Sequence, residues 1–192
     1  MKVATACANL AASIIVLNGK ASAKRSEAEM TLLKTIVFTV LVPGTVTVLV
    51  PYRILSSEST ATLTRIRFPG YLGVLPMLVG ISIYIWCAWD FTFAGHGTPA
   101  PIDPPKQLVV RGLYKYTRNP MYVGVFLVIL GEALLFQSGA LLIYALGALF
   151  LANLFIIFYE EPTLRRKFGE SYERYRGSVP RWIPLRVARI RH

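Results

Sequence analysis

A single arginine at the edge of an apolar run needs an explanation in terms of charge. Arg118 lies in YTRNPMYVGVFLVIL, and an unpaired guanidinium is costly close to hydrocarbon. Two adjacent carboxylates, Glu160 and Glu161, follow a second apolar run in YEEPTLRRKFG. The two runs are joined only by QSGA, and the arginine and the acidic pair lie at similar distances from this turn. Because an α-helix rises by about 1.5 Å per residue, an antiparallel hairpin would bring them to the same level.

The residues around Arg118 predict a pocket rather than one ion pair. Tyr114, Tyr116 and Tyr122 flank the arginine, and Gly112 allows close approach of the backbone. Two carboxylates are also more than one arginine requires. We therefore expect a polar pocket with aromatic walls at the membrane boundary. The alternative is a simple interfacial ion pair, with the arginine side chain reaching toward lipid headgroups.

Apolar helices must position these groups. Hydrophobic residues make up 54% of the 192 residues, and charged residues make up only 16%. Runs of about 17–25 apolar residues are long enough to cross a bilayer as helices. Four stretches qualify: 32–52, 71–89, 121–137 and 140–159. The sequence thus predicts an all-α, polytopic membrane protein with four core transmembrane helices, a C-terminal helical hairpin and an interfacial amphipathic tail helix.

The chain divides into three parts on this pattern. Residues 1–29 form an N-terminal extension, which could be a cleaved signal, a short fifth span or the product of a misplaced start codon. Residues 30–94 contain the first two core helices. Residues 95–192 contain a Gly- and Pro-rich loop, the hairpin and a basic tail, and they carry the predicted pocket.

The net charge of +11 fits a membrane orientation better than nucleic-acid binding. Most Lys and Arg residues flank the apolar stretches, and no nucleic-acid-binding pattern accompanies them. The positive-inside bias predicts that the long loop and the tail are cytoplasmic. The two cysteines and two histidines lack metal-ligand spacing, so we expect no metal site.

Two polar residues inside the hairpin allow more than one interpretation. Glu132 is a functional candidate because acidic groups are rare in membrane helices, but an interhelical hydrogen bond is the favoured explanation. Asn153 is predicted to hydrogen-bond between helices. In the tail, an amphipathic helix that covers the pocket is predicted from the spacing of Leu164, Phe168, Tyr172 and Tyr175.

Two motifs in this order resemble the isoprenylcysteine carboxyl methyltransferase family and its phospholipid methyltransferase relatives. The first is LVVRGLYKYTRNPMYVG, with the pattern G-x-Y-x-x-x-R-[HN]-P-x-Y. The second is EEPTLRRKFGESYERYRGSVPRWIP, with the pattern E-E-x-x-L-x-x-x-F-G-x-x-Y-x-x-Y. The resemblance covers roughly residues 95–184 and is specific, because both extended motifs flank a helical hairpin.

The resemblance implies an integral membrane methyltransferase that uses S-adenosylmethionine and accepts a lipidic or prenylated substrate from the bilayer. It implies catalytic roles for Arg118, Asn119 and Glu160. The implied donor-binding residues are Val110, Gly112, Leu113, Tyr114, Arg118, Asn119, Pro120, Tyr122 and Glu161. Many family members have histidine at the position of Asn119. Because an amide does not titrate near neutral pH, a proton-transfer role for this residue is in doubt.

The residue types suit this chemistry. Arginine can bind the donor's carboxylate in a fork, and glutamate can bind its ammonium or ribose hydroxyls. A tyrosine face can stabilise a sulfonium through a cation–π contact. An isoprenylcysteine carboxylate, a phospholipid amine and a thiol all remain open as acceptors. The alternatives are a nicotinamide-dependent sterol or lipid reductase, and a non-enzymatic membrane scaffold or transporter component.

Overall fold

The computed structural model describes residues 22, 25–26, 29–57, 68–94 and 108–182. This part of the chain is helical, without strands, which confirms the all-α prediction. The elements after the first helix are η2 (Gly70–Gly73), α4 (Val74–Ala94), η3 (Gly112–Lys115), α5 (Pro120–Leu135), α6 (Gly139–Phe155), η4 (Ile156–Glu160), α7 (Glu161–Phe168) and α8 (Glu170–Ser178). The first helix, Glu29–Ser57, contains the π-helical turn η1 (Thr45–Leu49) and α2 (Val50–Ser57).

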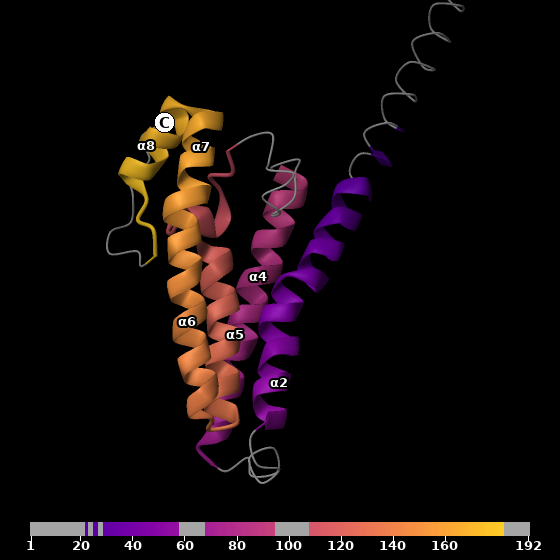
Figure 1. Cartoon of the computed structure of the whole chain (residues 1–192). Helices are drawn as coiled ribbons and strands as arrows, with labels where there is room; N and C mark the ends of the chain where they lie inside the picture. Colours follow the sequence, from indigo (N-terminus) through magenta and orange to yellow (C-terminus); the bar gives the residue numbers. More distant parts are fainter. Residues whose placement is uncertain (1–21, 23–24, 27–28, 58–67, 95–107, 183–192) are drawn as a thin grey trace, which may run out of the picture.

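Four long helical segments lie side by side and alternate in direction (Figure 1). Three of them, Glu29–Ser57, Gly70–Thr92 and Gly139–Phe168, are long and apolar enough to cross a membrane. The fourth, α5, has 16 residues and is about 24 Å long. It is therefore shorter than the hydrocarbon core of a typical bilayer, about 30 Å. The start of α5 lies at the same end of the bundle as α7 and α8, whereas the α5–α6 turn lies at the opposite end (Figure 1).

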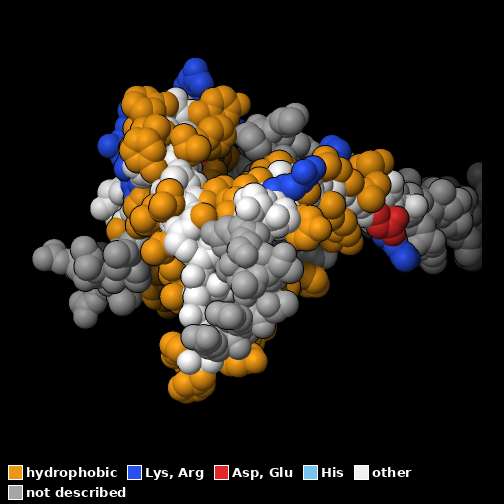
Figure 2. Space-filling model, turned by 60° about the horizontal axis from the view of Figure 1, so that its bottom comes forward, with side chains coloured by type: hydrophobic (Ala, Val, Ile, Leu, Met, Phe, Trp, Pro, Cys, Tyr) orange, Lys and Arg blue, Asp and Glu red, His pale blue; other side chains and the backbone are white. Residues whose placement is uncertain are grey.

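The outer surface of the bundle is strongly apolar. Large side chains such as Val40, Ile143 and Phe150 are more than half exposed. Hydrophobic side chains cover most of the described surface in the view of Figure 2. Soluble monomers rarely expose continuous apolar surfaces of this extent. With the three long apolar helices, this surface fits the predicted polytopic membrane protein.

Helix α4 and the turn η2 before it approach α5 through glycines. Gly73 lies against Gly131, and Gly80 lies against Gly124 in this antiparallel pair. A Cβ atom on Gly80 would stand 2.5 Å from the carbonyl oxygen of Gly124, which is too close for any side chain. Small residues allow membrane helices to pack closely, and here they place the end of α4 beside the start of α5.

Each of the two π-helical turns comes just before a proline. η1 is followed by Val50 and Pro51, and η4 is followed by Glu161 and Pro162. Because proline has no N–H and its ring clashes with the carbonyl four residues earlier, a widened turn accommodates it within a continuing helix. The first helix therefore continues past Pro51 to Ser57, beyond the end of the predicted span 32–52.

The predicted tail helix is two helices rather than one. α7 and α8 are separated at Gly169, which has a φ of 51°, a conformation that favours glycine. The amphipathic stripe is nevertheless brought together across this break. Buried Tyr172, Tyr175 and Val179 pack with the partly buried Leu108, Val110, Leu164 and Phe168.

The three-part division of the chain stays a prediction. Most of the extension 1–29, including any fifth span, lies outside the described residues, as do residues 95–107 of the long loop and 183–192 of the tail.

Candidate active site

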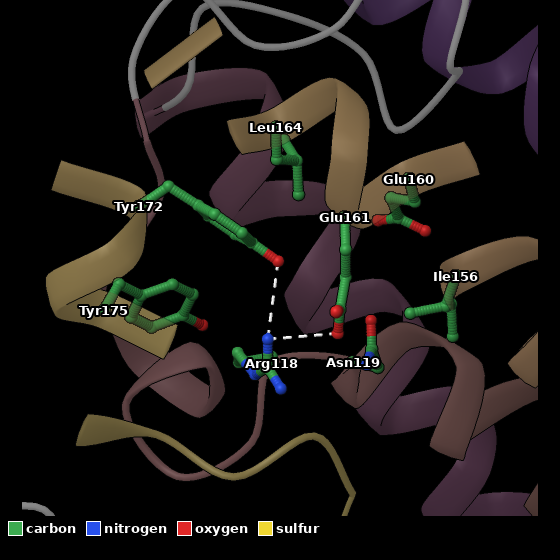
Figure 3. A pocket seen from close by; sticks show the side chains of 8 residues that line it. All are labelled: Arg118, Asn119, Ile156, Glu160, Glu161, Leu164, Tyr172 and Tyr175. Carbon is green, nitrogen blue, oxygen red and sulfur yellow. Dashed lines mark hydrogen bonds and ion pairs between the residues drawn. The ribbon is translucent and has the colours of Figure 1, made fainter. Parts of the chain in front are cut away.

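Arg118 and Glu161 form an ion pair at the end of the bundle. Arg118 lies two residues before the start of α5, and Glu161 is the first residue of α7. Arg118 Nη1 is 3.0 Å from Glu161 Oε1, and the side chains are only 10% and 15% exposed. Arg118 and Glu161 are thus in contact, as expected from their similar distances from the turn of the hairpin. The acidic partner shelters the arginine, and Figure 3 shows Glu161 pointing toward it.

A second arginine, which the sequence analysis did not single out, binds the same carboxylate. Arg181 Nε donates to Glu161 Oε1 at 2.8 Å, and Arg181 Nη2 donates to Oε2 at 3.1 Å. The hydrogen bond to Glu161 raises the pKa of Arg181, so its guanidinium is charged at every physiological pH. Both oxygens of Glu161 are therefore occupied by arginine.

The backbone around Arg181 is fixed to the segment before α5. The Arg118 N–H donates to the carbonyl of Pro180 at 2.9 Å. The Thr117 hydroxyl and the Asn119 side-chain amide both donate to the carbonyl of Arg181, at 2.9 Å and 3.1 Å. Asn119 is only 6% exposed. Its side chain therefore helps to hold the tail in place, as well as lying beside the ion pair.

Glu160 faces a different partner from Glu161. Its Oε2 accepts a hydrogen bond of 2.9 Å from the Tyr122 hydroxyl on α5. Figure 3 shows its carboxylate pointing away from Arg118. The two adjacent acids thus divide their contacts, one with arginines and the other with a tyrosine.

A small cavity lies between these groups. Its volume is about 20 Å³, which is room for about one water molecule. The lining residues come from the start of α5, from η4 and from α7 and α8: Arg118, Asn119, Ile156, Glu160, Glu161, Leu164, Tyr172 and Tyr175. The Tyr172 hydroxyl accepts from Arg118 Nη1 at 3.4 Å. Arg118 Nε is buried and has no hydrogen-bond partner among the described residues.

Six predicted donor-binding residues do not line this cavity. Val110 packs against the buried residues of α8, Tyr114 is buried against Cys87, and Tyr122 binds Glu160. Leu113 and Pro120 instead line a larger apolar groove of about 280 Å³. Gly112 is the sixth. The roles of these residues toward a donor stay predictions.

Gly112 contacts an acid that the sequence analysis overlooked. It has a φ of 55°, and a Cβ atom at this position would collide with Asp90 Oδ2 near the end of α4. Asp90 is 3% exposed and forms an ion pair with Arg111 Nε at 3.1 Å. This contact fixes the segment before Tyr114, whose carbonyl accepts a 2.8 Å hydrogen bond from the Tyr175 hydroxyl.

The two polar residues inside the hairpin have different surroundings. Asn153 Oδ1 accepts from Trp182 Nε1 at 3.1 Å, so it binds α6 to the tail rather than to another bundle helix. Glu132 lies one turn before the end of α5, and its Oε2 is buried without a hydrogen-bond partner in the described part of the chain. It is remote from the cavity, which lies at the opposite end of α5.

Comparison with known proteins identifies the class to which this bundle and its polar end belong. The family model for phospholipid methyltransferase matches residues 68–171, more than half of the chain. The chain therefore belongs to the phospholipid methyltransferase family. The matched region begins just before η2 and ends in α8, so it includes α4, α5, α6, α7 and most of the cavity lining.

A curated relative carries a more specific name. The chain is 44% identical over 81 residues to the protein-S-isoprenylcysteine O-methyltransferase of Schizosaccharomyces pombe. The aligned region is 41% of this chain and 33% of that relative, so the chain matches about a third of the relative's length. No solved structure matches the chain significantly.

Proposed function

We propose that the protein is an integral membrane methyltransferase that uses S-adenosylmethionine and methylates a lipidic or amphipathic acceptor. The observation that carries this proposal is the largely buried cluster of Arg118, Glu160 and Glu161 at one end of an apolar helical bundle, where the paired side chains of Arg118 and Glu161 are 10% and 15% exposed. This cluster lies within the region that matches the family model. The name of the relative from Schizosaccharomyces pombe supports the same class of reaction.

The charged groups fit the donor's amino-acid moiety. Arg118 would bind its carboxylate. The Nε–H of Arg118 is available for this contact, because it is buried and has no hydrogen-bond partner among the described residues. Glu161 would bind its ammonium. The rings of Tyr172 and Tyr175 lie on the same cavity and would face its sulfonium. When bound, S-adenosylmethionine supplies an electrophilic methyl group. A cavity of about 20 Å³ must widen to admit such a molecule, so side-chain movement accompanies binding.

The apolar groove supports a lipidic acceptor. It is lined by Ile83, Leu113, Tyr116, Thr117, Pro120 and Val123, and its volume is about 280 Å³. Thr117 and Pro120 directly flank the Arg118–Asn119 pair, so the groove and the polar cavity share one stretch of backbone. An acyl or prenyl chain in the groove would hold its polar end close to the cavity. Methyl transfer then depends mainly on positioning and on exclusion of water.

The orientation of the bundle follows from charge. Arg111 and Arg118 precede α5, and Arg165, Arg174 and Arg181 lie in the tail, all at the end of the bundle that carries the cavity. By the positive-inside bias we place this end on the cytoplasmic side. There a soluble donor and a membrane-embedded acceptor can reach the site together.

The direct test is methyl transfer to lipids. Purified protein incubated with methyl-labelled S-adenosylmethionine and a lipid extract should transfer label into a lipid fraction, whose chemical analysis identifies the acceptor. The Glu161→Gln variant should transfer much less label, because the ammonium contact loses its charge. Glu173→Gln is the matched control, because Glu173 lies on α8 outside the cavity. No transfer by the wild-type protein to prenylated thiols, phospholipids or phenolic lipids would contradict the proposal.

A further inference from the structure

The two arginines on Glu161 do not have equal surroundings. Arg118 is 10% exposed and also contacts Tyr172, whereas the Arg181 side chain is 30% exposed. Arg181 makes the closer, two-pronged contact, with 2.8 Å and 3.1 Å hydrogen bonds to both oxygens. The more exposed arginine thus occupies both oxygens of the carboxylate.

The side chain of Arg181 can leave Glu161 without disturbing the tail. Its carbonyl is held by Thr117 and Asn119, and the carbonyl of Pro180 is held by the Arg118 N–H. The next residue is held independently, through the contact of Trp182 with Asn153. None of these bonds involves the guanidinium of Arg181, which can therefore turn toward solvent while the backbone stays in place.

We propose that Arg181 sets the affinity of the donor site, because its guanidinium competes with the ammonium of S-adenosylmethionine for the carboxylate of Glu161. The inference rests on the proposed function. Arg181 is a positioning residue that acts through Glu161. When its guanidinium is bound there, it occupies both oxygens of Glu161, and the carboxylate cannot accept the ammonium.

Competition of this kind lowers the apparent affinity of the donor. A ligand binds in proportion to the fraction of molecules whose site is free, so removal of the competing group increases affinity. Charge-assisted, two-pronged contacts are among the stronger hydrogen bonds in proteins. The fraction of molecules in which Arg181 has released Glu161 is therefore small. We expect the Arg181→Met variant, which keeps the long side chain without its charge, to bind S-adenosylmethionine about tenfold more tightly.

The experiment is calorimetric titration of S-adenosylmethionine into the full-length protein in detergent, with thermal unfolding measured in parallel. Arg181→Met should bind the donor more tightly and yet unfold at a lower temperature, because an ion pair has been removed. A purely structural role would lower both affinity and stability. Arg181→Lys, which keeps a cation, should bind more weakly than Arg181→Met. Arg174→Met, an exposed arginine on α8 outside the cavity, is the matched control and should bind like the wild type.

A second pair of variants tests whether the effect passes through Glu161. In a Glu161→Gln background, the change Arg181→Met should leave donor affinity unchanged, because the shared carboxylate is gone. If Arg181→Met binds the donor as the wild type does or more weakly, the competition is refuted while the proposed function stands. Arg181→Gln gives the same decision if the methionine variant fails to fold. If the wild type binds no donor and transfers no methyl group, the proposed function and this inference fail together.

Discussion

Replacing Arg118 with alanine should reduce the affinity for S-adenosylmethionine about 100-fold, because hydrogen bonds to charged groups contribute about 1.5–3 kcal/mol. The proposed contact pairs the guanidinium with the donor's carboxylate in a site where Arg118 is only 10% exposed. Water screens such a contact poorly, so its loss is not compensated. Glu161→Ala should cause a similar loss by removing the ammonium contact. Calorimetric titration of the purified variants in detergent measures both effects.

The controls separate loss of the site from loss of the fold. The backbone bond from Arg118 N–H to Pro180 persists in any variant at this position except proline, so the tail should stay attached. Arg118→Lys keeps the charge but not the fork, and we expect an intermediate affinity. Arg165→Ala removes an arginine that is 55% exposed and pairs with Glu173, so it should bind as the wild type does. Unchanged affinity in both Arg118→Ala and Glu161→Ala would show that the cluster does not bind the donor.

Replacing Gly73 with leucine should prevent the bundle from folding. A Cβ atom here would collide with the carbonyl oxygen of Gly131 and would stand 2.6 Å from the backbone nitrogen of Leu135. Because both are backbone atoms within α5, no side-chain rotation relieves the contact. Overpacking in cores costs about 1–3 kcal/mol even where side chains can adjust, so we expect a larger loss here. Size-exclusion profiles and thermal unfolding followed by circular dichroism measure the outcome.

Gly147 provides the matched control for this substitution. It lies within α6, and a Cβ atom there would meet nothing within 4 Å. Gly147→Leu makes the same change of residue in a membrane helix but adds apolar surface toward lipid, so the variant should unfold near the wild-type temperature. Equal stability of the two variants would contradict the close packing of η2 on α5.

The level of the hairpin ends could be predicted from the sequence, but the detailed contacts could not. Counting from the turn places Arg118 opposite the acidic pair because helical rise is nearly constant. Counting does not say which acid turns toward the arginine, because the helix widens at η4, which ends at Glu160 itself. Glu161 is the one that pairs with Arg118, and Glu160 turns to Tyr122.

Other contacts depend on segments without a periodic pattern. Arg181 follows α8 in an irregular stretch, so nothing in its spacing indicates that it returns to Glu161. Asp90 is surrounded by aromatic residues typical of a membrane interface, which concealed a buried acid paired with Arg111. The glycines at this helix contact could have been found, because Gly73 of η2 and Gly80 of α4 have the same spacing as Gly124 and Gly131 of α5.

The π-helical turn Ile156–Glu160 lies between the membrane-spanning part of α6 and Glu161, so it sets the direction in which the acid points. In it, the Glu161 N–H bonds to the carbonyl of Ile156, five residues earlier, so the turn holds one residue more than an α-helical turn. Loss of one residue here, for example the exposed Phe158, would convert the turn to α-helix and leave both flanking helices facing as they do now. Loss of a residue within α6 would instead rotate every later side chain by about 100° and turn Glu161 away from Arg118. Within this helix, changes in chain length are therefore tolerable only at the turn beside the acids.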